Sequence, residues 1–398
     1  MAVSINEAKT LITGSVQKNA TTEILLENAL GLVLAEDVIA SLNLPNFDNS
    51  AMDGYAIRYE DVDEEKERSL VVVAEVQAGG FSNHLIVQNE AIRIFTGAAL
   101  PEGADTVVIQ EHVTVSDKQI IINQLPEKGS NIRVTGEQIK TGDIALQKGT
   151  ELNPGALGFL ACFGITRVKV IDKPSISVVI TGDELVERGH ELEQGQIYES
   201  NSIALMSAIR FAGVDQCQMH RANDNKEALL QLVIRLMGES DVIIFTGGIS
   251  VGKYDFVGEV LKELQVEEVF YKVRQKPGGP LFFGMKGKQC FFGLPGNPAA
   301  VMACFYEYVL PALRKIKGNK DLFLQQAKLP LINAFKKNPR KGGFLKGKIE
   351  NNEVELLDNQ ASSMMRSFAQ ADCLIYAPED QENFNSGELI EVHYLPKI

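Results

Sequence analysis

The chain has 398 residues, of which 45% are hydrophobic and 23% are charged, and it carries a formal net charge of −13 at pH 7. This length predicts two to four domains of about 100 to 150 residues each. The acidic balance, with a pI near 5.0, argues against a nucleic-acid-binding protein and against one that binds anionic membranes.

The sequence also predicts where the protein resides. Its N-terminal residues contain no secretory signal pattern, and no apolar run approaches the roughly 18 residues that a membrane span requires. The five cysteines are scattered without any CxxC spacing, which favours reduced thiols over zinc ligands or disulfides. We therefore expect a folded protein of the cytoplasm.

The first part of the chain predicts helices around a β-rich insert. Ser4-Ile5-Asn6-Glu7 has the form of a capping box, so a helix is expected to begin there, and a second helix is expected around residues 22–30. Residues 41–140 are rich in short β-type runs separated by Gly, Pro and Asn. Helical sequence resumes over 141–171 and leads into the strand-like run TRVKVI, as if a β module interrupts one helical segment.

From Pro174 the pattern changes to strand, glycine-containing turn and helix, which indicates a mostly parallel sheet flanked by helices. The expected strands are 176–180, 242–245 and 290–292. Apolar residues at i, i+3, i+4 and i+7 predict four helices, which contain Leu205, Leu229, Val257 and Val301. After residue 319 only short β-like pieces follow, so a small β domain is expected there.

Ligands of parallel α/β sheets collect at the carboxyl ends of the strands. Three loops are expected there: TGDEL (181–185), TGGISVGKYD (246–255) and LPGNP (294–298). Glycines in the second loop allow backbone N–H groups to approach a phosphate, although a plain strand-to-helix turn with Asp255 as a cap explains the same residues. Asn297 is expected to cap the helix that begins with Pro298.

Carboxylates and basic groups also occur in these loops. Glu184 follows a strand directly and Asp224 precedes a helix that it is expected to cap; several carboxylates at one sheet edge could hold magnesium against a phosphate. In RQKPGGPLFFG (274–284), Arg274 and Lys276 precede two prolines that frame two glycines. Such a rigid basic loop suits an oxyanion, and a solvated basic turn fits the spacing equally well.

Taken together, these segments resemble the molybdopterin molybdenumtransferase family, which includes the bacterial MoeA proteins, plant homologues and the E domain of gephyrin. The resemblance covers the whole chain and rests on seven motifs in family order: NSAMDGYAI, IFTGAALPEGADTVV, NIRVTGEQIKTGD, TGDELV followed by QIYESN, TGGISVGKYDF, KPGGPLFFG and GLPGNPAAV.

The resemblance implies a fold of α/β plus β class in an elongated, multidomain homodimer. Its doubly wound α/β domain corresponds to 173–318, a split N-terminal helical domain to 1–40 and 141–172, an inserted β-rich domain to 41–140 and a C-terminal β domain to 319–398. It also implies that molybdate and adenylylated molybdopterin give molybdenum cofactor and AMP with the help of Mg²⁺, in a cleft between two subunits. The molybdopterin adenylyltransferase is the implied partner protein.

The resemblance further implies roles for individual residues. The catalytic acids are Asp53, Glu184, Asp224 and Asp255, of which Asp255 together with Asp224 holds the metal. Gly247, Gly248 and Ser250 match the loop for the pterin phosphate. Other substrate contacts are Thr96, Lys276, Pro277, Pro280, Arg274, Arg340 and either Ser362 or Ser363, with the basic residues and serines directed at molybdate.

Three positions depart from the family pattern. Gly279 replaces a lysine that many members carry in KPGKP, Lys253 stands where Asp or Glu is common, and Gln138 stands where Asp is usual. These departures leave open a paralogue with altered oxyanion choice or lower turnover. They also leave open a non-catalytic pterin-binding or scaffold protein, and an enzyme that acts on another phosphorylated pterin or nucleotide.

Overall fold

The computed structural model describes residues 2–62, 69–222, 225–249 and 256–397. The chain forms two compact units. The first comprises residues 1–35, 149–153 and 167–398, and the second comprises 36–148 and 154–166. No helix within the described ranges combines the length and the apolar character needed to cross a membrane.

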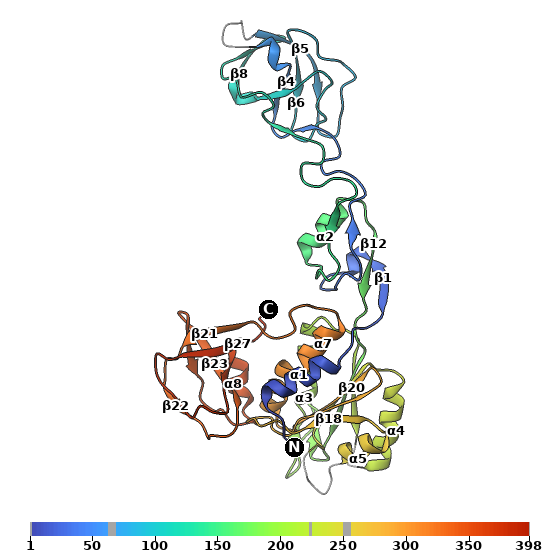
Figure 1. Ribbon diagram of the computed structural model, residues 1–398, viewed down its shortest axis with the longest axis vertical. Helices are drawn as coiled ribbons and strands as arrows, with labels where there is room; N and C mark the ends of the chain where they lie inside the picture. The colour runs from blue at the N-terminus through green and yellow to red at the C-terminus, as the bar shows by residue number, and fades with distance from the viewer. Residues whose placement is uncertain (1, 63–68, 223–224, 250–255, 398) are drawn as a thin grey trace. The chain divides into compact units, whose positions relative to one another are not determined.

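The second unit is built on a six-stranded sheet, as the β-rich sequence predicts (Figure 1). The strands follow the order β7-β4-β6-β5-β9-β8, in which only β5 and β6 run parallel. Buried apolar side chains pack in two clusters, one around Ile57 and Leu70 and one around Ile92 and Val107. The strand bounds are β4 (Gly54–Ile57), β5 (Ser69–Val76), β6 (Glu90–Ile94), β7 (Thr106–Ile109), β8 (Val113–Ser116) and β9 (Gln119–Ile122).

Shorter elements complete the second unit. They are β2 (Val38–Ile39), β3 (Asn49–Ser50), β10 (Ile132–Arg133), β11 (Ile144–Leu146), α2 (Pro154–Ala161) and the 3₁₀ turns η2 (Tyr59–Asp61) and η3 (Gln110–His112). Strand β2 pairs with β11, and β3 pairs with β10. Of the helical sequence expected over 141–171, which the structure describes throughout, only α2 forms a helix.

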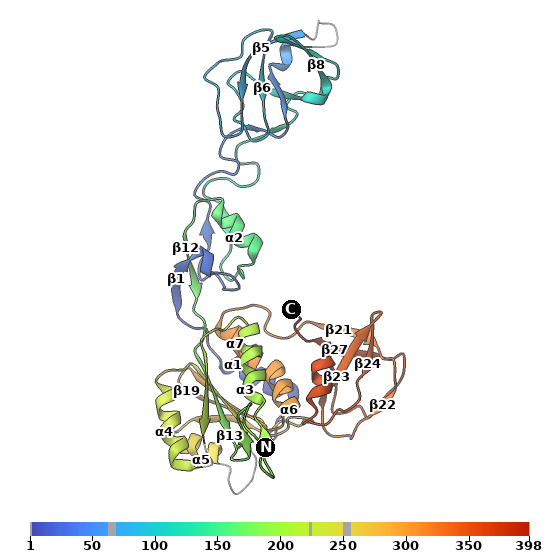
Figure 2. The same ribbon diagram turned by 180° about the vertical axis from the view of Figure 1, so that it is seen from behind.

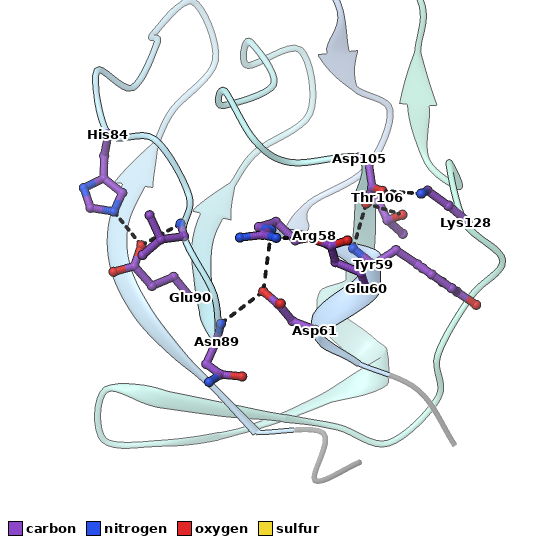
Figure 3. A network of polar contacts seen from close by, with 11 residues as sticks. Arg58, Tyr59, Glu60, Asp61, His84, Asn89, Glu90, Asp105, Thr106 and Lys128 are labelled. Carbon is purple, nitrogen blue, oxygen red and sulfur yellow. Dashed lines mark hydrogen bonds and ion pairs between the residues drawn. The ribbon is translucent and has the colours of Figure 1, made fainter. Parts of the chain in front are cut away.

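Carboxylates fix the η2 turn to its neighbours (Figure 3). The Tyr59 N–H donates to Asp105 Oδ1 at 2.7 Å, and Lys128 Nζ lies 3.1 Å from Asp105 Oδ2. Although partial burial opposes the shift, these two partners lower the pKa of Asp105. The Asn89 N–H donates to Asp61 at 3.0 Å. These contacts join the η2 turn to residues beside β6 and β7 and to the loop that carries Lys128, so we infer a structural role for the network.

The first unit begins with α1 (Ile5–Ser15), and its capping box is confirmed. Ser4 Oγ accepts from the Glu7 N–H at 3.2 Å, and the Glu7 carboxylate accepts from the Ser4 N–H at 2.6 Å. The expected second helix is wrong, since β1 (Thr21–Leu25) pairs antiparallel with β12 (Arg167–Ile171) and only a short 3₁₀ turn, η1 (Leu26–Asn28), follows. Two threonines and an isoleucine in β1 favour the extended chain, and β12 supplies its hydrogen-bond partner.

The central sheet of the first unit confirms the α/β prediction. Its order is β16-β13-β17-β20-β19-β18; the first four strands are parallel, β19 pairs antiparallel with β20, and β18 pairs antiparallel with β19. The three expected strands correspond to β13, β17 and β20. The bounds are β13 (Ile176–Thr181), β16 (Cys217–Ala222), β17 (Val242–Thr246), β18 (Glu267–Tyr271), β19 (Phe282–Lys286) and β20 (Gln289–Leu294).

Helices cover both faces of this sheet, as Figures 1 and 2 show. The four expected helices are α3 (Asn201–Phe211), α4 (Lys226–Met237), α5 (Phe256–Glu263) and α6 (Pro298–Cys304). Alternate residues of β17 separate the two faces: Ile244 packs with α1, α3 and α6, whereas Ile243 and Phe245 pack with α4 and α5. The sheet is therefore doubly wound, and the short pair β14 (Leu185–Val186) and β15 (Ile197–Tyr198) follows β13.

Helix α6 continues through a π-helical turn, η4 (Phe305–Val309), into α7 (Leu310–Ile316). This continuous helical segment is largely buried, including Glu307, which is only 2% exposed. The Glu307 carboxylate lies 2.5 Å from Lys9 Nζ on α1 and 2.7 Å from His393 Nδ1. Although burial opposes it, pairing with His393 and Lys9 lowers the pKa of Glu307.

The C-terminal part of the first unit contains short strands, as expected, in a five-stranded sheet of order β21-β27-β25-β23-β24. The division of the chain into two units does not separate this sheet from the α/β sheet, so the four-domain boundaries stay a prediction. The elements are β21 (Gln326–Pro330), β22 (Phe335–Lys336), β23 (Gly343–Glu350), β24 (Glu353–Leu356), α8 (Met365–Gln370), β25 (Cys373–Ala377), β26 (Asn383–Phe384) and β27 (Leu389–Tyr394).

Candidate functional site

Two adjoining pockets lie in the first unit where the parallel strands end. The larger, which we call the main pocket, has a volume of about 1060 Å³ and is lined by residues that follow β17, β18 and β20, together with 337–343 and 360–362. The smaller, which we call the side pocket, has a volume of about 620 Å³ and is lined by residues that follow β13 and β15. Both pockets share Gly247, Gly248, Gly296 and Asn297.

The two shared glycines after β17 are required by close packing. Gly247 and Gly248 have φ angles of 82° and 60°, in the region that favours glycine. A Cβ atom on Gly247 would lie 2.8 Å from the Thr181 carbonyl oxygen, and one on Gly248 would lie 2.7 Å from Thr181 Oγ1. The backbone of this loop therefore forms a thin wall between the pockets, as a loop that approaches a phosphate closely would require.

Asn201, at the start of α3, holds two walls of the pockets together. Its Nδ2 donates to Thr246 Oγ1 and to the Gly296 carbonyl, both at 2.8 Å. The residue is 8% exposed, and its Oδ1 has no hydrogen-bond partner among the described residues. The sequence assigns no role to Asn201, although its place in the QIYESN motif, directly before an apolar helix, marks it as a residue at a strand-to-helix junction.

The basic loop lines the main pocket, while its role in binding an oxyanion stays a prediction. Lys276, Pro277 and Pro280 all line the pocket, and the Lys276–Pro277 peptide bond is cis. The Lys276 N–H donates to the Gly342 carbonyl at 2.9 Å, which joins the loop to the second basic segment of the pocket. Gly279 lines the pocket as well, and a Cβ atom there would lie 3.0 Å from the Gln275 carbonyl oxygen.

Positive charge in the main pocket comes from two segments. Beside Lys276, the residues Lys337, Arg340 and Lys341 line it, and no Asp or Glu appears among the described lining residues. Burial lowers the pKa of Lys337, whose Nζ donates to the Lys341 carbonyl at 2.9 Å. Of the second segment, sequence reasoning identifies only Arg340. The run KKNPRKGG (336–343) is the sequence signal for Lys337 and Lys341. On sequence alone it is typical of a solvated turn, because only the fold brings it next to the basic loop.

Arg274 is expected from the sequence to contact the substrate, but its side chain binds Glu379. Its Nε donates to Glu379 Oε2 at 2.9 Å and its Nη1 donates to the Ala2 carbonyl at 2.7 Å. Hydrogen bonding to Glu379 raises the pKa of the guanidinium. Arg274 is not among the residues that line the main pocket, because its side chain is drawn to the carboxylate of a neighbouring segment.

Acidic residues line the side pocket instead. Glu184 lines it, and its carboxylate lies close to Gly182, where a Cβ atom would come within 2.9 Å of Oε2. Glu199 also lines it and accepts from the Ser202 N–H at 2.8 Å. Ser363 lines this pocket, whereas Ser362 lines the main pocket and accepts from Asn297 Nδ2 at 2.9 Å. Asn297 occupies the N-cap position of α6 ahead of Pro298, as expected, but its side chain makes no capping hydrogen bond.

Asp53 and Thr96 belong to the second unit and contact one another. Asp53 Oδ1 accepts from the Thr96 N–H at 2.8 Å and from Thr96 Oγ1 at 2.7 Å, and these bonds lower the pKa of Asp53. Arg93 Cζ lies 4.8 Å from the ring centroid of Tyr55 and 5.1 Å from that of Phe95. The carboxylate is thus ionised and held at the start of β4.

Three of the expected site residues lie outside the described residues, namely Asp224, Ser250 and Asp255, and so does Lys253, which departs from the family pattern. The cap of α4 is Asn225, which accepts from the Ala228 N–H at 3.0 Å, rather than the expected Asp224. Among the described residues no group of three or more His, Cys, Asp or Glu side chains could hold a metal ion. The magnesium ligands therefore stay a prediction.

Comparison with known proteins gives matches along the chain. Three family models match: "MoeA N-terminal region (domain I and II)" over residues 3–164, "Probable molybdopterin binding domain" over 177–315, and "MoeA C-terminal region (domain IV)" over 328–395. The molybdopterin molybdenumtransferase of Haemophilus influenzae is 34% identical over 98% of both chains. That of Staphylococcus epidermidis is also 34% identical, over 98% of this chain and 95% of its own. A crystal structure of a Pyrococcus horikoshii molybdopterin biosynthesis MoeA protein matches with a TM-score of 0.85 and 29% identity, covering 99% of this chain and 100% of that one.

Proposed function

Because the chain belongs to the MoeA family of molybdopterin molybdenumtransferases, we propose that it inserts molybdate into adenylylated molybdopterin and releases AMP. The observation that carries the proposal is the charge of the main pocket. Four cationic side chains and no described carboxylate line a cavity in a chain of net charge −13. Such a cavity is suited to a small oxyanion such as molybdate.

The wall between the pockets supports the same reaction. Adenylylated molybdopterin contains a pyrophosphate, and the bond that breaks to release AMP lies in the oxygen bridge between its two phosphorus atoms. The Gly247–Gly248 backbone is close-packed and free of side chains, so it can approach phosphate oxygens directly. Molybdate in the main pocket would then lie beside the substrate it enters.

Carboxylate oxygens are the ligands that magnesium prefers, and Glu184 presents them in the side pocket next to the glycine wall. We propose that Asp255 and Asp224 hold the ion, with Glu184 nearby, as the family motifs imply. Magnesium bound there would screen the charge of the pyrophosphate. The protein's own part is to orient the two substrates, so positioning dominates the proposed catalysis.

The lysine missing at position 279 does not leave the main pocket without charge. Lys337 and Lys341 line it in addition to Lys276 and Arg340. We propose that these two lysines compensate for Gly279, so that molybdate insertion is retained. This favours the enzyme over a non-catalytic scaffold.

The direct test is to mix purified protein with adenylylated molybdopterin, magnesium and molybdate and to measure AMP. We expect AMP release that depends on molybdate and magnesium. The control variant is Lys18→Gln, which removes the charge of an exposed lysine that lines neither pocket and should release AMP like the wild type. Absence of AMP from the wild-type chain under all conditions would refute the reaction.

We further propose that the enzyme is a homodimer in which Asp53 and Thr96 serve the pocket of the other copy. The ionised, partly exposed Asp53 carboxylate accepts hydrogen bonds from Thr96 alone among the described residues. Both bonds go to Oδ1, which suits a carboxylate that binds a ligand through Oδ2. Mixing inactive Asp53→Asn with inactive Glu184→Gln protein should restore activity in mixed dimers. If both acids act within one copy, mixing restores none.

The proposed substrate is the product of molybdopterin adenylylation. We therefore propose that the chain works in the cytoplasm next to the molybdopterin adenylyltransferase that supplies it. Co-purification of the two proteins, increased by adenylylated molybdopterin, would support this arrangement.

A further inference from the structure

Gln275 immediately precedes Lys276 in the basic loop and is only 2% exposed. Its Nε2 donates to the Gly278 carbonyl at 3.2 Å, which closes the turn that carries Lys276 and Pro277. Its Oε1 accepts a hydrogen bond from the hydroxyl of Tyr308. A single buried amide therefore joins the basic loop to the helical segment behind it.

The chemistry of the two partners fixes the orientation of this amide. Burial raises the pKa of the Tyr308 hydroxyl well above its usual value, so the group stays protonated and donates. The Gly278 carbonyl can only accept. Gln275 must therefore direct its nitrogen to Gly278, which leaves its oxygen to accept from Tyr308; a flipped amide would place its oxygen against the Gly278 carbonyl oxygen.

Tyr308 is held on a rigid base. It belongs to the π-helical turn η4, a type of helical irregularity that is frequent at functional sites. Its neighbour Glu307 is paired with Lys9 of α1 and with His393 of β27. Because elements on both sides fix the turn, the Tyr308 hydroxyl has a defined place for Gln275 to bind.

The basic loop has little room to adopt another position. The Lys276 N–H donates to the Gly342 carbonyl at 2.9 Å. At Gly278, which has a φ angle of 85°, an added Cβ atom would lie 2.5 Å from Cys304 Sγ. A displacement of Gln275 would therefore also displace Lys276 and Gly278.

We propose that Gln275 and Tyr308 are positioning residues that hold the basic loop in the geometry that binds molybdate; this inference rests on the proposed function. Without the Tyr308 hydroxyl, the buried Gln275 oxygen loses its described donor, and a buried acceptor without a donor is unfavourable. The loop relaxes to relieve it and carries Lys276 with it. One net hydrogen bond of about 1 kcal/mol corresponds to roughly fivefold in affinity.

The first test is Tyr308→Phe, with molybdate binding measured by calorimetry and turnover measured as AMP release. We expect the molybdate Kd and KM to rise about three- to tenfold, from the loss of one hydrogen bond. The kcat and the KM for adenylylated molybdopterin should change by less than about twofold, since the glycine wall is untouched. The matched control is Tyr306→Phe on the same π-helical turn, whose ring packs against Phe305 and Phe368.

A second variant separates positioning from stability. In the double variant Tyr308→Phe/Gln275→Met the Tyr308–Gln275 pair becomes apolar, which removes the unpaired Gln275 oxygen, while the Gly278 carbonyl loses the donor that Gln275 supplied. We expect its Tm to recover only part of the loss seen in Tyr308→Phe, because the Gly278 carbonyl stays unpaired, while its molybdate Kd stays weak, because the loop has lost its anchor. If affinity recovers together with Tm, or if Tyr308→Phe binds molybdate as tightly as Tyr306→Phe, the positioning role is refuted.

The binding measurement also keeps this inference distinct from the proposed reaction. A wild-type chain that binds molybdate but releases no AMP refutes the reaction, and the Kd values of the variants still decide the positioning role. A wild-type chain that releases AMP, with equal molybdate Kd in all variants, refutes the positioning role alone.

Discussion

The two pockets share one wall of glycines and differ in charge. The described residues that line the main pocket include Lys276, Lys337, Arg340 and Lys341 and no carboxylate, whereas those of the side pocket include Glu184 and Glu199 and no Lys or Arg. The strands place both at the same edge of the sheet. The loops on one side of the Gly247–Gly248 wall therefore bring basic side chains, and those on the other side bring acidic ones.

This difference explains how an acidic chain can bind a dianion. Charges within a few ångströms of each other interact far more strongly inside a cleft than across water-exposed surface. The described residues that line the main pocket include no carboxylate, so each charged side chain among them attracts molybdate. Carboxylates in the adjoining pocket can accompany a phosphate when a cation lies between them.

The largest effect is expected on the acidic side. Asp255→Ala should abolish AMP release, because the proposed magnesium ion loses its ligand, while the molybdate Kd stays within about twofold of the wild type. AMP release and calorimetric molybdate binding measure the two quantities, and circular dichroism checks the fold. Unchanged turnover in this variant would remove the metal assignment.

The next effect is expected on the basic side. Lys276→Gln should weaken molybdate binding about tenfold to a hundredfold, the value of a charged hydrogen bond of about 1.5–3 kcal/mol. The KM for adenylylated molybdopterin should change little, and calorimetry with each substrate checks both. Arg274→Gln is the control, since its guanidinium binds Glu379; equal losses in both variants would contradict the assigned pocket.

A smaller gain is expected when the family lysine is introduced. Gly279→Lys should tighten molybdate binding several-fold, less than a full charged hydrogen bond, because the new Cβ atom lies 3.0 Å from the Gln275 carbonyl. Gly279→Ala isolates the cost of that contact. Comparison of the two molybdate Kd values gives the value of the charge, and no difference between them would mean that Lys337 and Lys341 already supply it.

The smallest effect is a pH dependence. Burial lowers the pKa of Lys337 from the ordinary 10.5, so this lysine loses its charge at a lower pH than an exposed one. The protonated form attracts molybdate, so affinity should fall a few-fold as pH rises through the lowered pKa. Lys337→Gln should bind a few-fold more weakly at neutral pH and should not show this fall; a wild-type Kd that is flat up to pH 10.5 would contradict the role of Lys337.

The sequence predicts the α/β sheet well because its strands and helices have strong periodic patterns. The helices containing Leu205 and Val301 form where the apolar spacing predicts them. Gly247 and Gly248, which follow β17, line the pockets. The helix expected around 22–30 fails because β1 finds its partner β12 more than a hundred residues later. No local pattern reports such a distant partner.

The charges of the site are less predictable than the fold. Arg274 and Lys276 are two residues apart, yet one binds Glu379 and the other lines the pocket. Lys337 and Lys341 reach the pocket only because the C-terminal segment lies against the basic loop. No sequence pattern indicates a role for Gln275. Its partner Tyr308 resembles any other core aromatic in the sequence, and only the structure shows that its hydroxyl donates to Gln275 from a π-helical turn.

The π-helical turn also has a consequence for insertions and deletions. A π turn contains one residue more than the α-helical turn it replaces, and each α-helical residue turns the chain by about 100°. Removing a single residue from Phe305–Val309 should thus turn this segment into an ordinary α-helical turn and rotate the helix on one side of it against the other. The number of residues in this turn, and not only their identity, then determines whether the Tyr308 hydroxyl still contacts Gln275 in the basic loop.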